Sequence, residues 1–243
     1  MDVDLLITAL HDQGLLLGDA ADRAGLAAPV PTCPDWTVRE LLLHIGGVHR
    51  WAATIVADRL TESPQFGGDK PADDELLDWY RAGHAHLVHT LRVAPADLTC
   101  FAFFAAPSPL AFWARRQAHE TTMHRVDADR ATGPGTSAPI DADLADDGID
   151  ELLTGFVGRR GRGLRAETDR TLHVHTTDAD SHWLLRIGRD KPTAERVAGV
   201  EQADMSVSGP AELVYLALWH RAPWDGLTVT GDAEKVWSAG VRI

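Results

Sequence analysis

The order of apolar and polar residues predicts four long helices in the first half of the chain. Leu6, Leu10 and Leu17 recur at helical spacing, and comparable apolar stripes occupy three later stretches. Segments rich in Pro, Gly and Ser separate them. The ranges expected to be helical are residues 4–24, about 36–60, 71–92 and 110–132. Four helices with modest connections are typical of an antiparallel bundle.

The second and fourth predicted helices carry local start and stop signals. Asp35 or Thr37 can cap the second helix, and Glu40 completes a capping box if Thr37 is the cap. The fourth helix is expected to begin after Pro109 and to stop at the pair formed by residues 133 and 134, Gly-Pro. These signals delimit the predicted bundle.

The periodicity changes in the second half of the chain, between Gly133 and Pro139. One more helix is expected around residues 142–157, and another after Gly209 and Pro210. Between and beyond them lie short runs with alternating or β-branched residues, at 171–178, 182–188, 203–209 and 227–232. We therefore predict an α+β protein with a helical domain at 1–135 and a smaller α/β domain at 136–243.

Charge and composition narrow the class of protein. The chain has 243 residues, 44% of them hydrophobic and 24% charged, without a run of about 18 apolar residues that could span a bilayer. Lys and Arg total 23 against 36 for Asp and Glu, which gives a formal net charge of −13. Because such a surface repels phosphate backbones, nucleic acid is a poor candidate partner.

Two features favour a cytoplasmic location. The first residues, MDVDLL, are acidic where a secretory signal carries positive charge. Cys33 and Cys100 are the only cysteines, so no disulfide framework is expected. The sequence does not distinguish a monomer from a homodimer, because an apolar face that packs between subunits has the same residue pattern as an apolar face that packs within a core.

The hexapeptide HETTMH, residues 119–124, resembles the zinc-protease motif H-E-x-x-H with one extra residue. His119 and His124 are five residues apart, about 140° around a helix, so they do not share a face. Glu120 and His124 are four apart and do share one. The pair can provide two metal ligands, or it can be an intrahelical polar pair of the common kind. Spacing alone leaves both readings open.

A third ligand can come from the second helix, which contains His44 and His49. These two are also five apart and point to different sides. His44 shares its stripe with Leu41, Val48 and Trp51, the kind of face that packs into a bundle. We therefore expect His44 to point inward, either as a ligand or as a core histidine.

Two motifs in this order resemble those of one known family. They are DWTVRELLLHIGGVHRW, in which His44 follows Trp36 by eight residues, and ETTMHRVD, which matches an E-x-x-x-H-x-x-D pattern. The chain is identified by them as similar to the mycothiol-dependent maleylpyruvate isomerase family, within the DinB-like metalloenzyme superfamily. The resemblance implies a DinB-like four-helix bundle with a smaller C-terminal α/β domain.

The resemblance also implies site residues and cofactors. The metal ligands of the family fall on His44, Glu120 and His124, and a basic residue important for activity falls on Arg221. A divalent ion, Zn²⁺ before iron, nickel or manganese, and mycothiol as thiol cosubstrate are then expected. Arg221 has an ordinary alternative as a cation near a helix end.

The implied chemistry is thiol activation. A divalent cation that coordinates a thiol deprotonates it, and the resulting thiolate attacks an electrophilic carbon of a small molecule. Isomerase and S-transferase reactions both fit. Thr121, Thr122 and His119 depart from the residues of the isomerase at these positions and leave the substrate open. Two rival functions remain: a DinB-like hydrolase that uses metal-bound water, and a non-catalytic protein that binds metal for stress response.

Three further features of the sequence have weaker interpretations. The run HAHLVH at 84–89 is typical of a solvated helix face. His173 and His175 alternate onto one side of a predicted strand, but no third metal ligand is apparent for them. Cys33 lies in a turn without a neighbouring base, which favours a structural role.

Overall fold

The computed structural model describes residues 1–68, 70–133, 137–157, 164–199 and 202–241. Contacts divide the chain into two compact units, Met1–Ala138 and Pro139–Ile243. The first is helical and the second, smaller one is α/β, so the predicted fold class is confirmed. The expected domain boundary at 135/136 and the proline of the expected helix stop, residue 134, lie outside the described residues.

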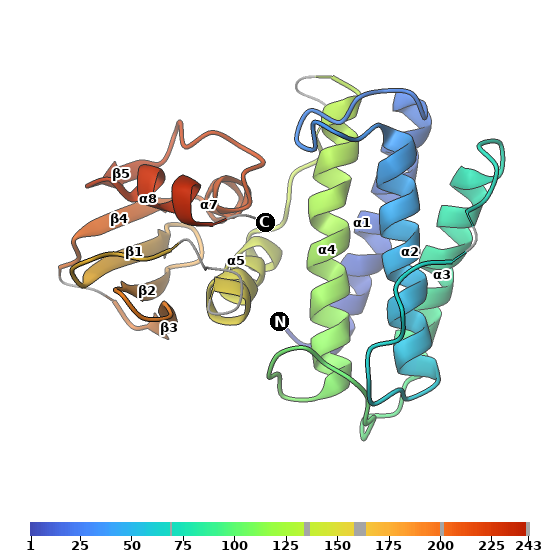
Figure 1. The fold of residues 1–243 in the computed structure, drawn as a ribbon, viewed down its shortest axis with the longest axis horizontal. Helices are drawn as coiled ribbons and strands as arrows, with labels where there is room; N and C mark the ends of the chain where they lie inside the picture. The colour runs from blue at the N-terminus through green and yellow to red at the C-terminus, as the bar shows by residue number, and fades with distance from the viewer. Residues whose placement is uncertain (69, 134–136, 158–163, 200–201, 242–243) are drawn as a thin grey trace. The chain divides into compact units, whose positions relative to one another are not determined.

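In the first unit, four long helices lie side by side (Figure 1). Their bounds are α1 Val3–Ala24, α2 Val38–Ala57, α3 Leu76–Val93 and α4 Pro109–Ala131. Each of three helix starts uses a side chain to satisfy free backbone N–H groups. Asp2 accepts from the backbone of Leu5 at 2.9 Å, and Ser108 caps α4 in the same way. At α2 the expected capping box forms, because Glu40 accepts from the backbone N–H of Thr37.

Two predicted helix bounds were wrong. α3 begins at Leu76 instead of residue 71, because the preceding residues form a turn in which the N–H of Glu75 donates to the carbonyl of Ala72. α2 ends at Ala57 instead of about residue 60. Arg59, with φ 52°, adopts a left-handed conformation that a right-handed helix does not accept.

Helix α4 is buried along most of its length although many of its residues are polar. Thr121, Arg125 and Asp127 are each 0% exposed. Buried polar groups destabilise a fold when they lack hydrogen-bond partners. The polar side chains of α4 therefore need partners on neighbouring elements or on the helix itself. Arg125 illustrates this, because it donates to Gln13 of α1 and to Asp129 of its own helix, both at 2.8 Å.

The second unit is built on a five-stranded mixed sheet (Figure 1). The strand order is β3-β2-β1-β4-β5, with β1 and β4 parallel and the other neighbours antiparallel. The elements are α5 Ala142–Asp150, the π-helical η1 Glu151–Val157, β1 Arg170–Thr176, β2 Ser181–Ile187, β3 Thr193–Val197, β4 Met205–Gly209, α7 Ala211–Leu218, β5 Thr228–Thr230 and α8 Ala233–Gly240. β3 and α8 were not predicted.

The two faces of this sheet differ in character. Val174 and Trp183 are fully buried on the face that α5 covers, and the Trp183 indole donates to Asp150 of α5 at 2.8 Å. Successive residues of a strand point to opposite faces. His173, His175 and His182 therefore lie on the opposite face, where they are half-buried.

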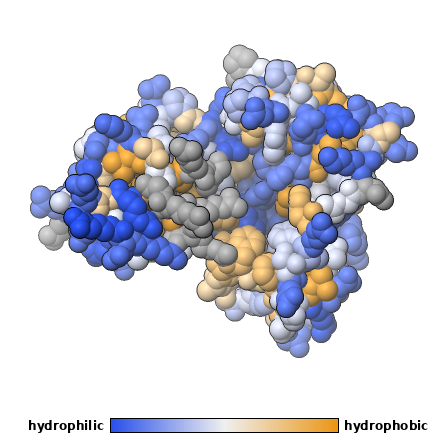
Figure 2. All heavy atoms as spheres, in the orientation of Figure 1, coloured by the Kyte–Doolittle hydropathy of each residue, from blue (hydrophilic) through white to orange (hydrophobic). Residues whose placement is uncertain are grey.

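No helix among the described residues is long and apolar enough to cross a membrane. Hydrophilic side chains cover much of the face shown in Figure 2. This agrees with the large excess of acidic residues in the sequence.

Candidate metal centre

The structure brings His44 of α2 together with Glu120 and His124 of α4. Nε2 of each imidazole lies 3.5 Å from the same oxygen, Oε1 of Glu120. The ligand atoms of all three residues lie within 4.8 Å of one another. The imidazole rings meet edge to face, with centroids 4.9 Å apart. Three donor atoms thus surround one small volume at the contact between α2 and α4.

Helical periodicity explains why these residues meet and their neighbours do not. Glu120 and His124 project from one face of α4 because they are four residues apart. His119 is fully buried and lies outside the group. On α2, His49 is also fully buried, but its Nε2 lies 2.9 Å from the hydroxyl of Thr121. His44 faces Glu120, but its side chain is 31% exposed, so the expectation that it points into the bundle in preference to His49 is wrong: His49 is the fully buried histidine of α2.

Trp36, just before α2, packs against both histidines. Its ring centroid lies 4.9 Å from that of His44 and 5.9 Å from that of His124. A bulky indole beside two imidazoles restricts their rotation and covers part of their surface. The segment that leads into α2 therefore helps to orient the candidate ligands.

His124 is also held from its other nitrogen. Nδ1 of His124 lies 2.9 Å from Oδ2 of Asp127, which is fully buried. Asp127 in turn accepts from the hydroxyl of Thr32 at 2.6 Å and from the thiol of Cys33 at 3.7 Å. A carboxylate that accepts from Nδ1–H fixes the tautomer whose Nε2 lone pair is available to a metal. The contact of Cys33 agrees with the structural role expected for it.

The second oxygen of Glu120 faces a buried cation. Arg116, one turn earlier on α4 and 3% exposed, donates to Oε2 of Glu120 at 2.9 Å. Burial alone raises the pKa of Glu120, but hydrogen bonds from His124 and His44 and the charge of Arg116 outweigh it and lower that pKa well below its usual value. Glu120 is therefore an anion at neutral pH, as a metal ligand must be.

The pKa of His124 is shifted in the opposite direction from that of Glu120. Burial lowers its pKa, but the carboxylates of Asp127 and Glu120 outweigh burial and raise the pKa of His124 to about 9. The two carboxylates thus favour the protonated form of the His124 imidazole. A metal ion that binds Nε2 must replace this proton.

Sequence reasoning proposed the three candidate ligands, which the structure brings together, but assigned no role to the residues that contact them. Asp127 follows His124 by three residues and Arg116 precedes Glu120 by four, so both pairs share a helix face. This spacing is a signal that sequence analysis could have used. The contact of Thr32 with Asp127, across 95 residues, has no such local signal.

Arg221 belongs to the second unit and follows α7. Its guanidinium donates to the carbonyl of Trp219 at 2.9 Å, and its backbone N–H donates to the carbonyl of Leu216 at 2.8 Å. These bonds satisfy carbonyls at the end of a helix, which is the ordinary alternative role of such a cation. The side chain is half-buried.

A cavity of about 530 Å³ lies near His44, although none of the three candidate ligands lines it. Leu43 and Gly47, which flank His44 on α2, line it, and so do Arg50 and Phe66. The ring centroid of Phe66 lies 6.4 Å from that of His44. This cavity offers space for a small molecule next to the histidine.

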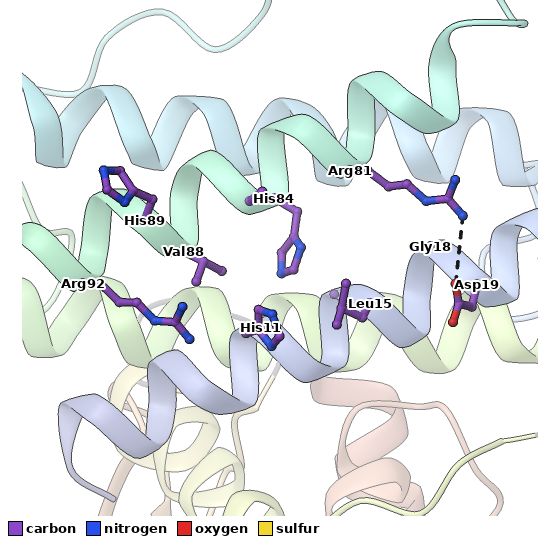
Figure 3. A pocket seen from close by; sticks show the side chains of 11 residues that line it. His11, Leu15, Gly18, Asp19, Arg81, His84, Val88, His89 and Arg92 are labelled. Atoms are coloured by element: carbon purple, nitrogen blue, oxygen red, sulfur yellow. Dashed lines mark ion pairs between the residues drawn. The ribbon is translucent and has the colours of Figure 1, made fainter.

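A second cavity, of about 450 Å³, lies between α1 and α3 and contains none of the three candidate ligands (Figure 3). His84 points into it and is only 3% exposed. The expectation of a solvated face at residues 84–89 is wrong for this histidine. Its Nε2 lies 3.0 Å from the carbonyl of Leu10, and Gly14, with no side chain, makes room for the ring.

The sequence and the fold were compared with known proteins. The sequence model of the mycothiol maleylpyruvate isomerase N-terminal domain matches residues 7–129, and that of the corresponding C-terminal domain (MDMPI) matches residues 143–236. A comparison with curated proteins gives no match.

Solved structures resemble nearly the whole chain. The crystal structure of the mycothiol-dependent maleylpyruvate isomerase is 13% identical, with a TM-score of 0.63, and the alignment covers 95% of this chain and 93% of that one. A histidine-to-alanine mutant of that isomerase gives 14% identity, a TM-score of 0.64 and the same coverage. At this identity the likeness establishes the fold, while the domain models establish the relationship. The chain therefore belongs to the mycothiol-dependent maleylpyruvate isomerase family, an enzyme family.

Proposed function

We propose that this protein is a mycothiol-dependent isomerase or S-transferase that holds a divalent metal ion, most simply Zn²⁺, at His44, Glu120 and His124. Its substrates are mycothiol and a small electrophile. The proposal of a metal ion rests on one observation: two imidazole nitrogens converge on one carboxylate oxygen, each at a distance of 3.5 Å.

The donor set fits zinc. Two imidazoles and one carboxylate with an open fourth position are typical of catalytic zinc sites. With metal–ligand bonds of about 2.0–2.1 Å, tetrahedral geometry separates neighbouring donors by about 3.3 Å. The 3.5 Å separations at Glu120 are close to this value, so small side-chain rotations suffice.

The supporting residues fit the same interpretation. Asp127 orients His124 through Nδ1 and leaves its Nε2 toward Glu120. Arg116 neutralises the carboxylate oxygen that faces away from the histidines. These contacts hold the donors in place before any ion binds, which is the arrangement that catalytic sites use to limit reorganisation.

The bound ion supplies positive charge that favours the thiolate form of a thiol at neutral pH. The protein contributes the orientation of the ligands, the indole of Trp36 that limits water around them, and the adjacent cavity lined by Gly47, Arg50 and Phe66. We assign to Arg221 the role of binding a substrate carboxylate, because a guanidinium is planar and permanently charged.

The experiment that tests this function uses the purified full-length chain with mycothiol. Isomerisation of maleylpyruvate and conjugation of mycothiol to a bimane reagent are measured separately. Each assay is run on the protein as isolated, after removal of metal by a chelator, and after addition of Zn²⁺. We expect at least one of the two reactions to require mycothiol, to disappear with the chelator and to return with Zn²⁺.

The controls separate the rival functions. Hydrolysis of an activated ester that depends on metal but is indifferent to mycothiol would identify a hydrolase instead. Stoichiometric metal binding without turnover in any assay would identify a binding protein. Activity that survives complete removal of metal would contradict the proposed role of the ion.

A further inference from the structure

A second group of metal-binding side chains lies in the C-terminal sheet, within one hairpin. It consists of His175 at the end of β1, Asp180 in the following turn and His182 at the start of β2. We propose that these three residues bind a divalent transition-metal ion of the borderline class, Zn²⁺, Ni²⁺ or Cu²⁺. This site is distinct from the one in the helical unit, and the proposal does not depend on the function assigned above.

The hairpin itself brings the ligands together. β1 and β2 are antiparallel neighbours, and His175 is paired directly with His182 across them. Side chains of such a pair point to the same face. In the connecting turn, Asp180 has φ 48°, a left-handed conformation that Asp tolerates better than most residues. Nε2 of His175 and Nε2 of His182 each lie 3.6 Å from Oδ1 of this residue.

A third histidine, His173, contacts the nitrogen of His182 that does not face Asp180. Nε2 of His173 lies 2.9 Å from Nδ1 of His182. When His182 donates its Nδ1–H to His173, the lone pair on Nε2 of His182 faces Asp180 and is available to a metal. A hydrogen bond to the remote nitrogen is the usual support of a metal-binding histidine.

One nitrogen in the group lacks a partner. Nε2 of His175 is buried and makes no hydrogen bond to any described residue, since its 3.6 Å separation from Asp180 is too long for one. A buried polar atom without a partner costs stability. Coordination of a metal ion satisfies this atom and the facing nitrogen of His182 together.

Metal binding requires the two imidazole rings to rotate. The imidazoles of His175 and His182 are nearly parallel, at 3°, with centroids 4.2 Å apart. Their in-plane lone pairs converge on one ion only after the rings turn toward each other. Their side chains are 25% and 17% exposed, and Asp180 is 91% exposed, so the carboxylate can follow the ion. Two nitrogens and one oxygen favour Zn²⁺, Ni²⁺ or Cu²⁺ over Mg²⁺ or Ca²⁺.

The test measures Zn²⁺ binding to the full-length chain by calorimetry, in the absence of mycothiol. We use a background in which His44→Ala and His124→Ala remove the candidate ligands in the helical unit. We expect about one equivalent of Zn²⁺ to bind in this background, as a single site of this kind predicts. Addition of His175→Ala or His182→Ala should abolish that equivalent, whereas the exposed His86→Ala control should leave it unchanged.

The supporting role of His173 has its own readout. His173→Ala should retain the equivalent but weaken its affinity by roughly 10–100-fold, the usual effect of losing such a hydrogen bond. In imidazole ¹⁵N NMR spectra of the background chain, Zn²⁺ should shift the Nε2 resonances of His175 and His182. If the background variant does not fold, the wild-type chain provides the same comparison, because His182→Ala should then remove one of two equivalents.

Two results would overturn the proposal. One is a background chain that folds, as circular dichroism reports, and binds no Zn²⁺. The other is Zn²⁺ binding that persists unchanged in both His175→Ala and His182→Ala. Loss of mycothiol-dependent activity would bear on the proposed function alone, since none of these measurements uses mycothiol.

Discussion

Nδ1 of His124 lies 2.9 Å from a buried carboxylate oxygen of Asp127, three residues further along the same helix. This contact orients the imidazole so that its other nitrogen faces Glu120. Thr32, from the segment that precedes α2, completes the support by donating to the same carboxylate. The arrangement of the three candidate ligands therefore depends on residues outside that group.

Asp127→Asn tests this dependence. The amide retains the shape of the side chain but removes the charge that favours the Nδ1–H tautomer of His124. We expect the affinity for Zn²⁺ to fall by about 10–100-fold, measured by competition with a chromogenic chelator. Asp74→Asn, which removes an exposed charge ahead of α3, serves as the control. Equal affinities of the two variants would contradict the supporting role of Asp127.

The three candidate ligands are tested by metal content. After dialysis, the candidate centre should retain less zinc in each of the variants His44→Ala, Glu120→Ala and His124→Ala. Each variant leaves only two donors, and two donors seldom hold the ion. The exposed His86→Ala is the matched control. Elemental analysis is run in the His182→Ala background, so that zinc in the sheet does not obscure the result. Undiminished zinc in all three variants would exclude the site.

Arg221→Met tests the proposed contact with substrate. If the guanidinium stabilises negative charge on the reacting substrate, kcat should fall by about 100-fold or more while bound zinc stays at the wild-type level. Arg186→Met removes an exposed Arg from the same unit and should leave kcat unchanged. A wild-type kcat in Arg221→Met would leave Arg221 only its role at the end of α7.

Gly46 and Gly47 on α2 should respond to alanine in opposite directions. A Cβ at Gly46 would lie 2.2 Å from the ring of Trp79, which is itself held under the guanidinium of Arg50 at 3.8 Å. We expect Gly46→Ala to lower the free energy of unfolding by about 1–3 kcal/mol. At Gly47 the nearest atom is 3.4 Å away, on Phe66.

Gly47→Ala thus removes backbone freedom from a helix without a severe clash. It should raise the free energy of unfolding by about 0.5–1 kcal/mol. Urea titration of both variants measures the difference. Destabilisation of similar size in both would show that the contact between α2 and α3 is not the cause.

Two buried histidines of the bundle should make its stability depend on pH. Burial, followed by the charge of a neighbouring histidine, lowers the pKa of His49 well below its usual value, and burial also lowers that of His84. The unfolded chain therefore binds more protons than the folded one once the pH falls below about 6.5. The free energy of unfolding should decrease below that pH, by up to about 1.4 kcal/mol per pH unit for each histidine.

His84→Gln removes one of these contributions and retains a donor for the carbonyl of Leu10. Urea unfolding of the metal-free chain between about pH 5 and pH 7.5 should then show a shallower dependence than the wild type. His86→Gln removes an exposed imidazole from the same helix and is the control. An unchanged slope in His84→Gln would contradict the assignment.

Local signals were sufficient for most of the secondary structure. Thr37 and Glu40 indicate the start of α2, and apolar periodicity locates the four long helices. Both signals depend on residues that are close together in the sequence. β3 and α8 escaped prediction. The exposed edge strand TAERV shows little alternation of apolar and polar residues, with Val197 alone strongly apolar, and α8 is short.

The sequence by itself determined the pairs that share a helix face, Glu120 with His124 and His124 with Asp127, because their geometry follows from the helical repeat. Only the tertiary structure decided which distant groups join them. His44 meets Glu120 because α2 packs against α4, and His182 faces His175 because the turn sets the register of the hairpin. These contacts depend on how separate elements pack, and no pattern within one element contains that information.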